Sequence, residues 1–240
     1  DITDSIQYAR RIQKAILPQE SNLKKIFPES FVLFMPRDIV SGDFYYLTPI
    51  GASGVLLALA DCTGHGVPGA LMSMIGNNLL HHMEHDKWLT SAAAILEDID
   101  DRLRKIFRFD ESKEIKDGMD VSVCLIDPQR KKIIFSGAKA PLWLVKRNEL
   151  VEFKPNRFGI GGLRQMENKF DEQVIDVVDG DIFYLFTDGY TDQFGGPDNK
   201  KFSKRKLREL FLSISKNSLP EQKKILEETI ISWKGNYDQT

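Results

Sequence analysis

The chain has 240 residues, of which 42% are hydrophobic and 28% charged, a composition typical of globular proteins rather than disordered, collagen-like or disulfide-rich ones. Its 33 basic and 35 acidic residues leave a net charge of −2, which gives no electrostatic case for nucleic acid or an anionic membrane as the main partner. The two cysteines, Cys62 and Cys124, stand alone, which argues against a disulfide framework or structural zinc site and favours a reducing, cytoplasmic setting.

The first predicted element is an amphipathic helix that ends before Pro18. Its apolar residues recur at steps of three and four and so share one face: Ile2, Ile6, Ala9, Ile12 and Ile16. Either this helix packs on the rest of the domain, or it is the end of a longer signalling helix or coiled coil. We therefore separate residues 1–22, a linker or regulatory helix, from a main domain at residues 23–240. Apolar runs such as 55–60 are far shorter than the roughly 20 residues that span a bilayer, so we expect no membrane contact from this segment.

Short strands and paired helices make up the rest of the chain. The predicted strands are rich in aromatic and β-branched residues and are separated by turn residues. They are 31–36, 43–50, 54–60, 120–127, 131–138, 141–147, 150–154, 170–177 and 181–188. The helices are expected at 66–83 and 90–107, the second capped by Thr90 or Ser91, and at 204–213 and 221–234. Because strands come in runs and helices in pairs, the pattern predicts an α+β fold with antiparallel sheets.

Three aspartates stand at strand ends with glycine close by: Asp43, Asp61 and Asp188. A carboxylate at the edge of an apolar strand is costly to desolvate unless it is paired or binds a cation. Asp43 and Asp61 lie on strands that can form a hairpin through residues 51–54, so their side chains can face one point. Converging carboxylates suit Mg²⁺ or Mn²⁺, and two such ions roughly 3.5–4 Å apart can activate a water for in-line attack on phosphorus. The alternative is that each of these aspartates only forms a turn.

The residues around these aspartates match a known family. The segments SGDFY, ADCTGHGVPGALMS, GMDVSV, FSGAKAPLWLV and FTDGYTDQFGG, in this order, resemble the sporulation stage II protein E branch of the PPM-type, metal-dependent serine/threonine phosphatases. The opening SIQYARRIQKAILP is similar to the helix that precedes such domains when they are attached to bacterial sensor modules. The resemblance implies that residues 23–240 form a PPM-type phosphatase domain, a four-layer α-β-β-α sandwich of two antiparallel sheets flanked by helix pairs.

The resemblance also implies a site and a reaction. Asp43, Asp61 and Asp188 match metal ligands, with Asp43 bridging two Mn²⁺ or Mg²⁺ ions, and the backbone carbonyl of Cys62 matches a main-chain ligand. Asp120 matches an acidic position near the same site. The implied substrate is a phosphoserine or phosphothreonine protein, such as an anti-sigma-factor antagonist, dephosphorylated by direct attack of a two-metal-activated water. An upstream sensor domain in the same chain and a homodimer through the first helix are the implied regulatory partners.

Two departures from the family pattern bear on activity. Lys139 and Ala140 stand where many members carry Asn, His or another small polar residue, so Lys139 is either a contact to substrate phosphate or a plain surface lysine. The family closes with an acidic pair leading into a final strand, whereas this sequence stops at Thr240, and Asp238 precedes the expected position. We therefore expect the domain to lack its final strand. A catalytically weak or inactive regulatory module of the same fold is the alternative function, and a two-metal phosphodiesterase is a third.

Four other patterns have both a functional and a structural interpretation. His65, four residues after Asp61, either orients a water or leaving group or fixes the start of the next helix. The HHMEH segment at 81–85 lacks the HExxH spacing, which favours a solvated helix end over a zinc site. The glycines of 158–163 form either a turn or a loop over the site mouth. The basic cluster at 200–208 is either a solvated helix face or a docking surface for an acidic partner protein.

Overall fold

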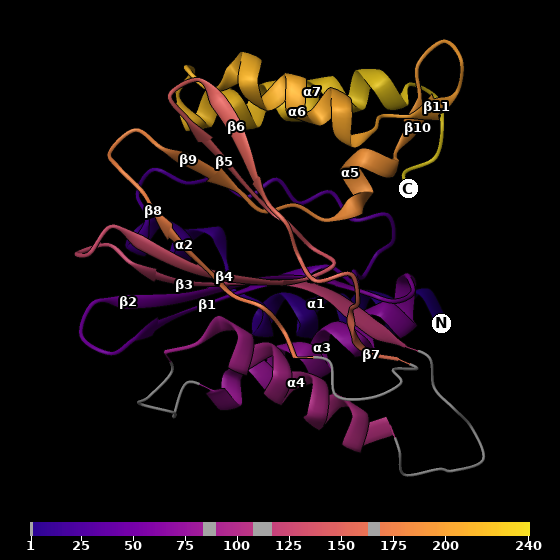
Figure 1. Ribbon diagram of the computed structural model, residues 1–240. Helices are drawn as coiled ribbons and strands as arrows, with labels where there is room; N and C mark the ends of the chain where they lie inside the picture. Colours follow the sequence, from indigo (N-terminus) through magenta and orange to yellow (C-terminus); the bar gives the residue numbers. More distant parts are fainter. Residues whose placement is uncertain (1, 84–89, 108–116, 163–168) are drawn as a thin grey trace.

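A computed structural model describes residues 2–83, 90–107, 117–162 and 169–240. Two antiparallel sheets lie face to face, and a pair of helices covers the outer face of each, which makes four layers (Figure 1). The predicted α+β fold, with two antiparallel sheets flanked by helix pairs, is therefore confirmed.

The larger sheet has the strand order β1-β2-β3-β4-β8, and the short β7 pairs with β3. Its strands are β1 (Phe44–Ile50), β2 (Gly54–Cys62), β3 (Gly118–Asp127), β4 (Lys132–Ala138), β7 (Ile160–Gly161) and β8 (Gln173–Asp176). The smaller sheet has the order β6-β5-β9, formed by β6 (Glu149–Phe153), β5 (Leu142–Lys146) and β9 (Ile182–Tyr184). Helices α3 (Gly66–His82) and α4 (Ala92–Phe107) cover the larger sheet, and α6 (Lys204–Ile214) and α7 (Leu219–Lys234) cover the smaller one. The remaining elements are α1 (Ile2–Ile16), α2 (Glu20–Ile26), α5 (Asp188–Asp192), β10 (Phe194–Gly195) and β11 (Lys200–Lys201).

Both faces of the central strands β2 and β3 are buried, because these strands lie between a helix layer and the other sheet. On β2, Leu56 and Ala58 share a core with α3 and α4, whereas Val55 and Leu57 belong to the core between the sheets. On β3 it is the even-numbered residues, such as Cys124, that lie between the sheets. Since successive side chains of a strand point to opposite faces, odd-numbered residues of β2 and even-numbered residues of β3 face the smaller sheet.

Helix starts follow the capping signals in the sequence. Ser91 precedes α4, and its Oγ accepts a hydrogen bond from the backbone of Ala94 at 3.1 Å, so of the two predicted caps Ser91 is the one used. Ser218 and Glu221 form a reciprocal capping box at the start of α7. Such caps satisfy backbone N–H groups that have no partner within the helix.

The predicted strand at 31–36 does not form. Phe31, Leu33 and Met35 pack against the core beneath α6 and α7, while Phe34 is about half exposed, at 51%. The alternation of apolar residues therefore correctly predicted that one face of the segment is buried. A strand also needs a neighbouring strand to pair with, and the alternation does not predict one. The strand predicted at 181–188 is also shorter, since β9 ends at Tyr184 and α5 begins at Asp188.

The first helix contacts the domain through a polar residue. Gln13 is the one buried residue within the described part of α1, and it lies against the loop before β1 and against α3. The predicted apolar stripe is largely exposed, with Ile2 at 79% and Ile12 at 44%. Packing of this stripe on the domain is therefore not what holds α1 in place. Among the described residues, no helix has the length and hydropathy needed to cross a membrane.

Candidate active site

The strand registers bring three of the predicted aspartates to one end of the larger sheet. Phe44 pairs with Ala60 in the predicted β1–β2 hairpin, so the next position outward sets Asp43 beside Asp61. Asp61 in turn pairs directly with Asp120 on β3. Odd-numbered residues of β2 and even-numbered residues of β3 face the smaller sheet, so the side chains of Asp61 and Asp120 both point toward it.

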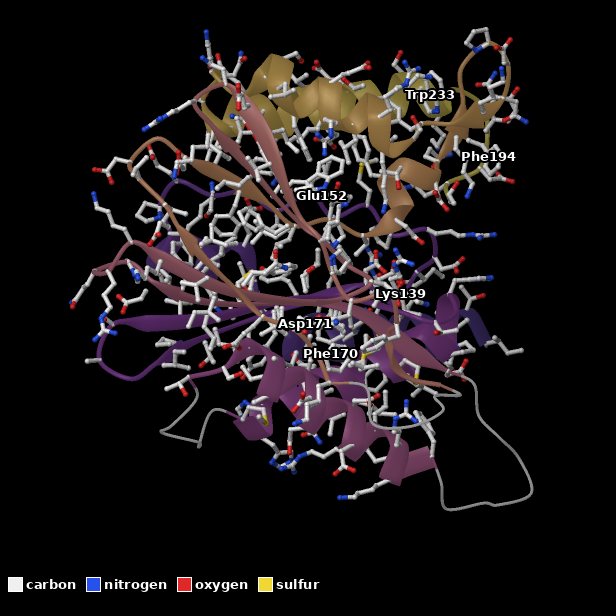
Figure 2. The ribbon with its side chains drawn as sticks, viewed as in Figure 1. Lys139, Glu152, Phe170, Asp171, Phe194 and Trp233 are labelled. Atoms are coloured by element: carbon white, nitrogen blue, oxygen red, sulfur yellow. The ribbon has the colours of Figure 1, made fainter. Side chains whose placement is uncertain are left out.

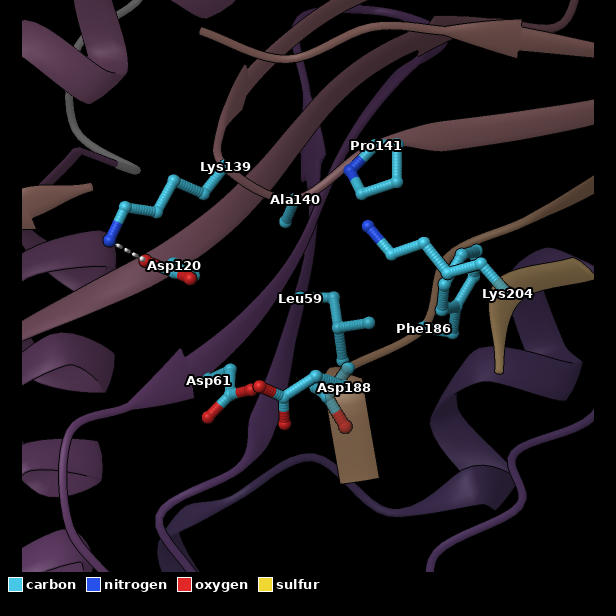
Figure 3. Close-up of a pocket in the computed structure, with 10 residues that line it drawn as sticks. Leu59, Asp61, Asp120, Lys139, Ala140, Pro141, Phe186, Asp188 and Lys204 are labelled. Atoms are coloured by element: carbon cyan, nitrogen blue, oxygen red, sulfur yellow. Dashed lines mark ion pairs between the residues drawn. The ribbon is translucent and has the colours of Figure 1, made fainter. Parts of the chain in front are cut away.

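The fourth aspartate, Asp188, comes from the segment that follows the smaller sheet. The chain leaves β9 through Phe186 and reaches Thr187, which precedes α5, and Asp188 is the first residue of that helix. The Oγ1 hydroxyl of Thr187 donates a 2.7 Å hydrogen bond to Oδ2 of Asp43. Figure 3 shows Asp188 beside Asp61. The site therefore lies between the end of the larger sheet, which contributes Asp43, Asp61 and Asp120, and the start of α5, which contributes Asp188.

Close backbone contacts explain why two positions near Asp43 are glycine. A Cβ atom on Gly42 would lie 3.0 Å from the carbonyl oxygen of Gly64 and 3.2 Å from that of Cys62. A Cβ on Gly69, in the first turn of α3, would lie 2.5 Å from the Gly64 oxygen. Only glycine fits such contacts without movement of the backbone. They hold the Cys62 carbonyl against the loop that carries Asp43.

The carboxylates are buried enough to affect one another. Burial, together with the charges of Asp43 and Asp188, raises the pKa of Asp61 to about 8. Burial also raises the pKa of Asp43, while the hydrogen bond from Thr187 acts to lower it. Ionised carboxylates this close repel one another, so the cluster favours bound positive charge. In the described part of the chain, no three His, Cys, Asp or Glu side chains are placed closely enough to hold a metal ion as they stand.

The donor set fits a hard divalent cation. Carboxylate oxygens and the carbonyl of Cys62 are the ligand types that Mg²⁺ and Mn²⁺ prefer. The Cys62 side chain belongs to the core on the helix side of β2, away from these carboxylates. Burial raises the pKa of the Cys62 and Cys124 thiols well above the usual range, so neither is suited to act as a nucleophile.

Asp120 has a lysine partner. The Nζ atom of Lys139 lies 3.7 Å from Oδ1 of Asp120. Burial raises the pKa of Asp120, and the charge of Lys139 opposes that rise. Lys139 directly follows β4 at the end of the sandwich (Figure 2), with a left-handed φ of 56° and its backbone N–H bonded to the carbonyl of Asn156 at 2.9 Å. Lys139 therefore lies at the site, and its first contact there is Asp120.

A small cavity of about 50 Å³ opens between these groups (Figure 3). Its polar lining residues come from the end of the larger sheet, from the start of α5 and from α6: Asp61, Asp120, Lys139, Thr187, Asp188 and Lys204. Sequence reasoning did not single out Thr187 or assign Lys204 to a site. A hydroxyl directly before Asp188 was a usable signal for Thr187. Lys204 belongs to the basic cluster at 200–208, whose composition is also typical of an ordinary solvated helix face, so the sequence gives no reason to single it out.

The other sequence patterns lie elsewhere or border the site. His65 precedes α3, with Nδ1 at 2.9 Å from Oδ2 of Asp38 and a side chain 68% exposed, which favours its structural role at the helix start. A Cβ on Gly159 would lie 2.8 Å from Oδ1 of Asp120, so the loop before β7 borders the site. Asp238 is exposed, and its carbonyl accepts a hydrogen bond from the Gln193 side chain.

Two patterns lie partly outside the described residues. In the HHMEH segment, positions 84 and 85 fall outside them, while Nδ1 of His81 lies 3.5 Å from the hydroxyl of Tyr46. In the glycine-containing segment at 158–163, position 163 falls outside them, and Ile160 and Gly161 pair with β3.

Comparisons with known proteins agree with this geometry. A family model described as stage II sporulation protein E matches residues 51–239. The comparison with curated proteins finds no match. Among solved structures, the SiaA-PP2C domain of Pseudomonas aeruginosa is 33% identical, with a TM-score of 0.89, over 99% of this chain and 92% of its own.

Two more distant structures share the fold. The PP2C phosphatase domain and regulatory-domain fragment of Bacillus subtilis SpoIIE is 19% identical, with a TM-score of 0.65, over 83% of this chain and 56% of that one. RsbX, solved in complex with magnesium, is 17% identical, with a TM-score of 0.57, over 81% of this chain and 83% of its own. At these identities the likeness concerns the fold alone.

Proposed function

Because the chain belongs to the stage II sporulation protein E family of PP2C-type serine/threonine phosphatases, we propose that it removes phosphate from phosphoserine or phosphothreonine on a bacterial signalling protein. An anti-sigma-factor antagonist is the substrate class that the family resemblance favours. The proposed cofactors are two Mn²⁺ or Mg²⁺ ions, and the magnesium complex of RsbX supports this choice by analogy.

The observation that carries this proposal is the meeting of carboxylates from the larger sheet and from α5 around Asp61. Asp43, Asp61 and Asp188, with the carbonyl of Cys62, are the proposed metal ligands, and Asp120 is the proposed outer acidic residue. Bound divalent ions supply an activated water and neutralise charge on the phosphoryl oxygens.

The protein's own residues have distinct tasks in this proposal. Thr187 holds the Asp43 carboxylate in place through its 2.7 Å hydrogen bond. Lys139 neutralises Asp120, so that this carboxylate repels an incoming phosphate less. Both cysteines are buried, which argues against a covalent cysteinyl-phosphate intermediate and supports the proposed direct hydrolysis.

The test is release of phosphate from a phosphoserine peptide in the presence of Mn²⁺. Replacing Asp43 by alanine should lower the rate by more than about 100-fold, because loss of even an outer partner of a metal ligand costs 10- to 100-fold. Asp179→Asn is the matched control, since Asp179 is exposed and pairs only with Lys131 among the described residues. Equal activity in Asp43→Ala and the unaltered protein would contradict the proposal.

The alternative, an inactive module of the same fold, has a different outcome in this experiment. It would release no phosphate from any phosphopeptide, and the absence of saturable Mn²⁺ binding in calorimetry would favour it. Turnover of a cyclic dinucleotide, with none of a phosphopeptide, would instead favour a phosphodiesterase.

The segment 1–22 is proposed to link this domain, at 23–240, to an upstream sensor domain on the cytoplasmic side. The exposed apolar residues of α1, including Ile2, Tyr8 and Ile12, support a role in homodimer formation, because apolar stripes on a helix commonly pair.

A further inference from the structure

The structure separates one basic residue from the rest of the cluster at 200–208. Five of the six lysines and arginines in this segment have partners. These are Lys200 with Asp198 at 3.1 Å, Lys201 with Asp192 at 2.6 Å, Arg205 with Glu209 at 3.9 Å, Arg208 with Glu152 at 3.4 Å, and Lys206 over the ring of Trp233 at 3.8 Å. Lys204 has neither an ion pair nor a hydrogen bond to any residue that the structure describes, and it alone of the six lines the cavity at the carboxylates.

The backbone of Lys204 is held in place although its side chain is exposed. Lys204 is the first residue of α6, and the hydroxyl of Ser203 caps the helix by accepting from the backbone of Lys206 at 3.5 Å. Leu207 and Phe211, one and two turns further along, are buried in the core between the smaller sheet and the helices α6 and α7. A mobile four-carbon stem thus extends from a fixed point at the cavity rim.

The two cavity lysines are placed differently. In Figure 3, Lys139 extends toward Asp120, while Lys204 approaches from the opposite side, near Pro141. The charge of Lys204 also acts on Asp120, which places it within electrostatic range of the acidic groups. Lys139 already has a carboxylate partner, so among the described residues that line this cavity Lys204 is the cation that remains available to a ligand.

We propose that Lys204 binds the phosphoryl group of the phosphoprotein substrate, with its ammonium group donating to a phosphoryl oxygen; this inference rests on the proposed phosphatase function. A phosphorylated serine carries close to two negative charges and strong acceptor oxygens. Divalent ions held by the carboxylates would attract the phosphate from one side of the cavity, and Lys204 lies on the α6 side of the same cavity. Lysine binds phosphate as a point charge and needs no fixed fork geometry, which suits a flexible side chain on a rigid helix start.

The experiment compares Lys204→Met, which keeps the stem and removes the charge, with Arg205→Met, its exposed neighbour. With a phosphoserine peptide and Mn²⁺, Lys204→Met should raise KM by about 10-fold or more, since a hydrogen bond to a charged group contributes roughly 1.5–3 kcal/mol. Competitive inhibition by inorganic phosphate should weaken by a similar factor. Arg205→Met should stay within about twofold of the unaltered protein, because exposed ion pairs contribute little. Lys204→Arg should restore most of the phosphate affinity.

Phosphate binding by calorimetry, on the Mn²⁺-loaded protein, keeps this test separate from turnover. An unaltered protein that binds phosphate but hydrolyses no peptide contradicts the proposed function alone, and weaker binding by Lys204→Met still supports the role of Lys204. Equal phosphate affinity and equal KM in Lys204→Met and the unaltered protein would overturn the inference, as would an unaltered protein that binds no phosphate. The melting temperature should not change in Lys204→Met, which excludes a folding defect.

Discussion

At the scale of single residues, the hydroxyl of Thr187 is the contact that joins the two sheets at the site. Its 2.7 Å hydrogen bond to Asp43 links the segment after β9 to the start of β1. The bond fixes the orientation of a carboxylate that we propose as a metal ligand. Partners of this kind orient a ligand that would otherwise have to be ordered when the ion binds.

Replacing Thr187 by valine, which keeps the shape and removes the donor, should weaken Mn²⁺ binding by about 10- to 100-fold. The measurement is calorimetric titration with Mn²⁺. Thr187→Ser, which restores the hydroxyl, should recover most of the affinity. Unchanged Mn²⁺ affinity in the valine variant would show that the hydrogen bond has no positioning role.

Sequence reasoning selected the acidic residues of the site more readily than their partners. Asp43, Asp61 and Asp188 stand out because a charge at the end of an apolar strand beside glycine is unusual. Thr187 and Lys204 do not stand out, because hydroxyls and lysines are common on surfaces. Their roles depend on the way the smaller sheet and α6 approach the larger sheet, which no local pattern encodes.

At the scale of elements, α1 is connected to the site through Gln13. The Nε2 group of this buried side chain donates to the carbonyl of Ser41 at 2.6 Å and to Oγ of Ser73 at 2.9 Å, while its Oε1 accepts from the backbone of Ser41 at 3.1 Å. Oγ of Ser41 in turn accepts from the backbone N–H of Asp43 at 3.0 Å. A shift of α1 would therefore disturb the loop that carries Asp43.

Replacing Gln13 by leucine should destabilise the protein by about 1–3 kcal/mol, because the buried polar groups of Ser41 lose their partners. Phosphatase activity should fall more than stability alone predicts, since the Asp43 loop loses its support. Urea unfolding and peptide dephosphorylation measure the two effects. Gln7→Leu, on the exposed side of α1, is the control and should leave both unchanged. Wild-type stability and activity in Gln13→Leu would contradict this connection.

Element prediction was most accurate where local signals and burial agreed. The β1–β2 hairpin and the α4 cap formed as expected from the residues 51–54 and Ser91. The segment 31–36 shows the limit of such signals, because its alternation reflects packing on a core rather than pairing with a strand. The polar anchor of α1 was also not predictable, since an apolar stripe is normally the side that packs.

At the scale of the whole molecule, the four-layer arrangement followed from the grouping of strands and helices together with the family resemblance. Successive apolar side chains of β2 and β3 pack alternately into the two cores, so both faces of these strands are buried. This pattern does not determine which end of one sheet lies against which end of the other. That relative placement decides the site, because Asp188 reaches Asp61 only across the junction between the sheets. Charge repulsion at this junction should therefore limit the stability of the metal-free fold.

This reasoning predicts that Mn²⁺ stabilises the fold as a whole. An ion that binds only the folded state at 100 times its Kd adds about 2.7 kcal/mol of stability. For a domain of this size, that corresponds to a rise in melting temperature of roughly 5–11 °C, reversed by a chelator. The measurement is scanning calorimetry with and without Mn²⁺.

The variant Asp61→Asn makes the prediction sharper when stability is measured above about pH 8, where Asp61 is ionised, because it removes one of the mutually repelling charges while it weakens the proposed metal site. Without metal, the variant should melt at the same temperature as the unaltered protein or higher, since a neutral amide avoids the repulsion from Asp43 and Asp188. With Mn²⁺ the order should reverse, as only the unaltered protein gains stability. A variant that is less stable in both conditions would mean that Asp61 supports the fold in the same way as any buried polar residue, without a link to cation binding.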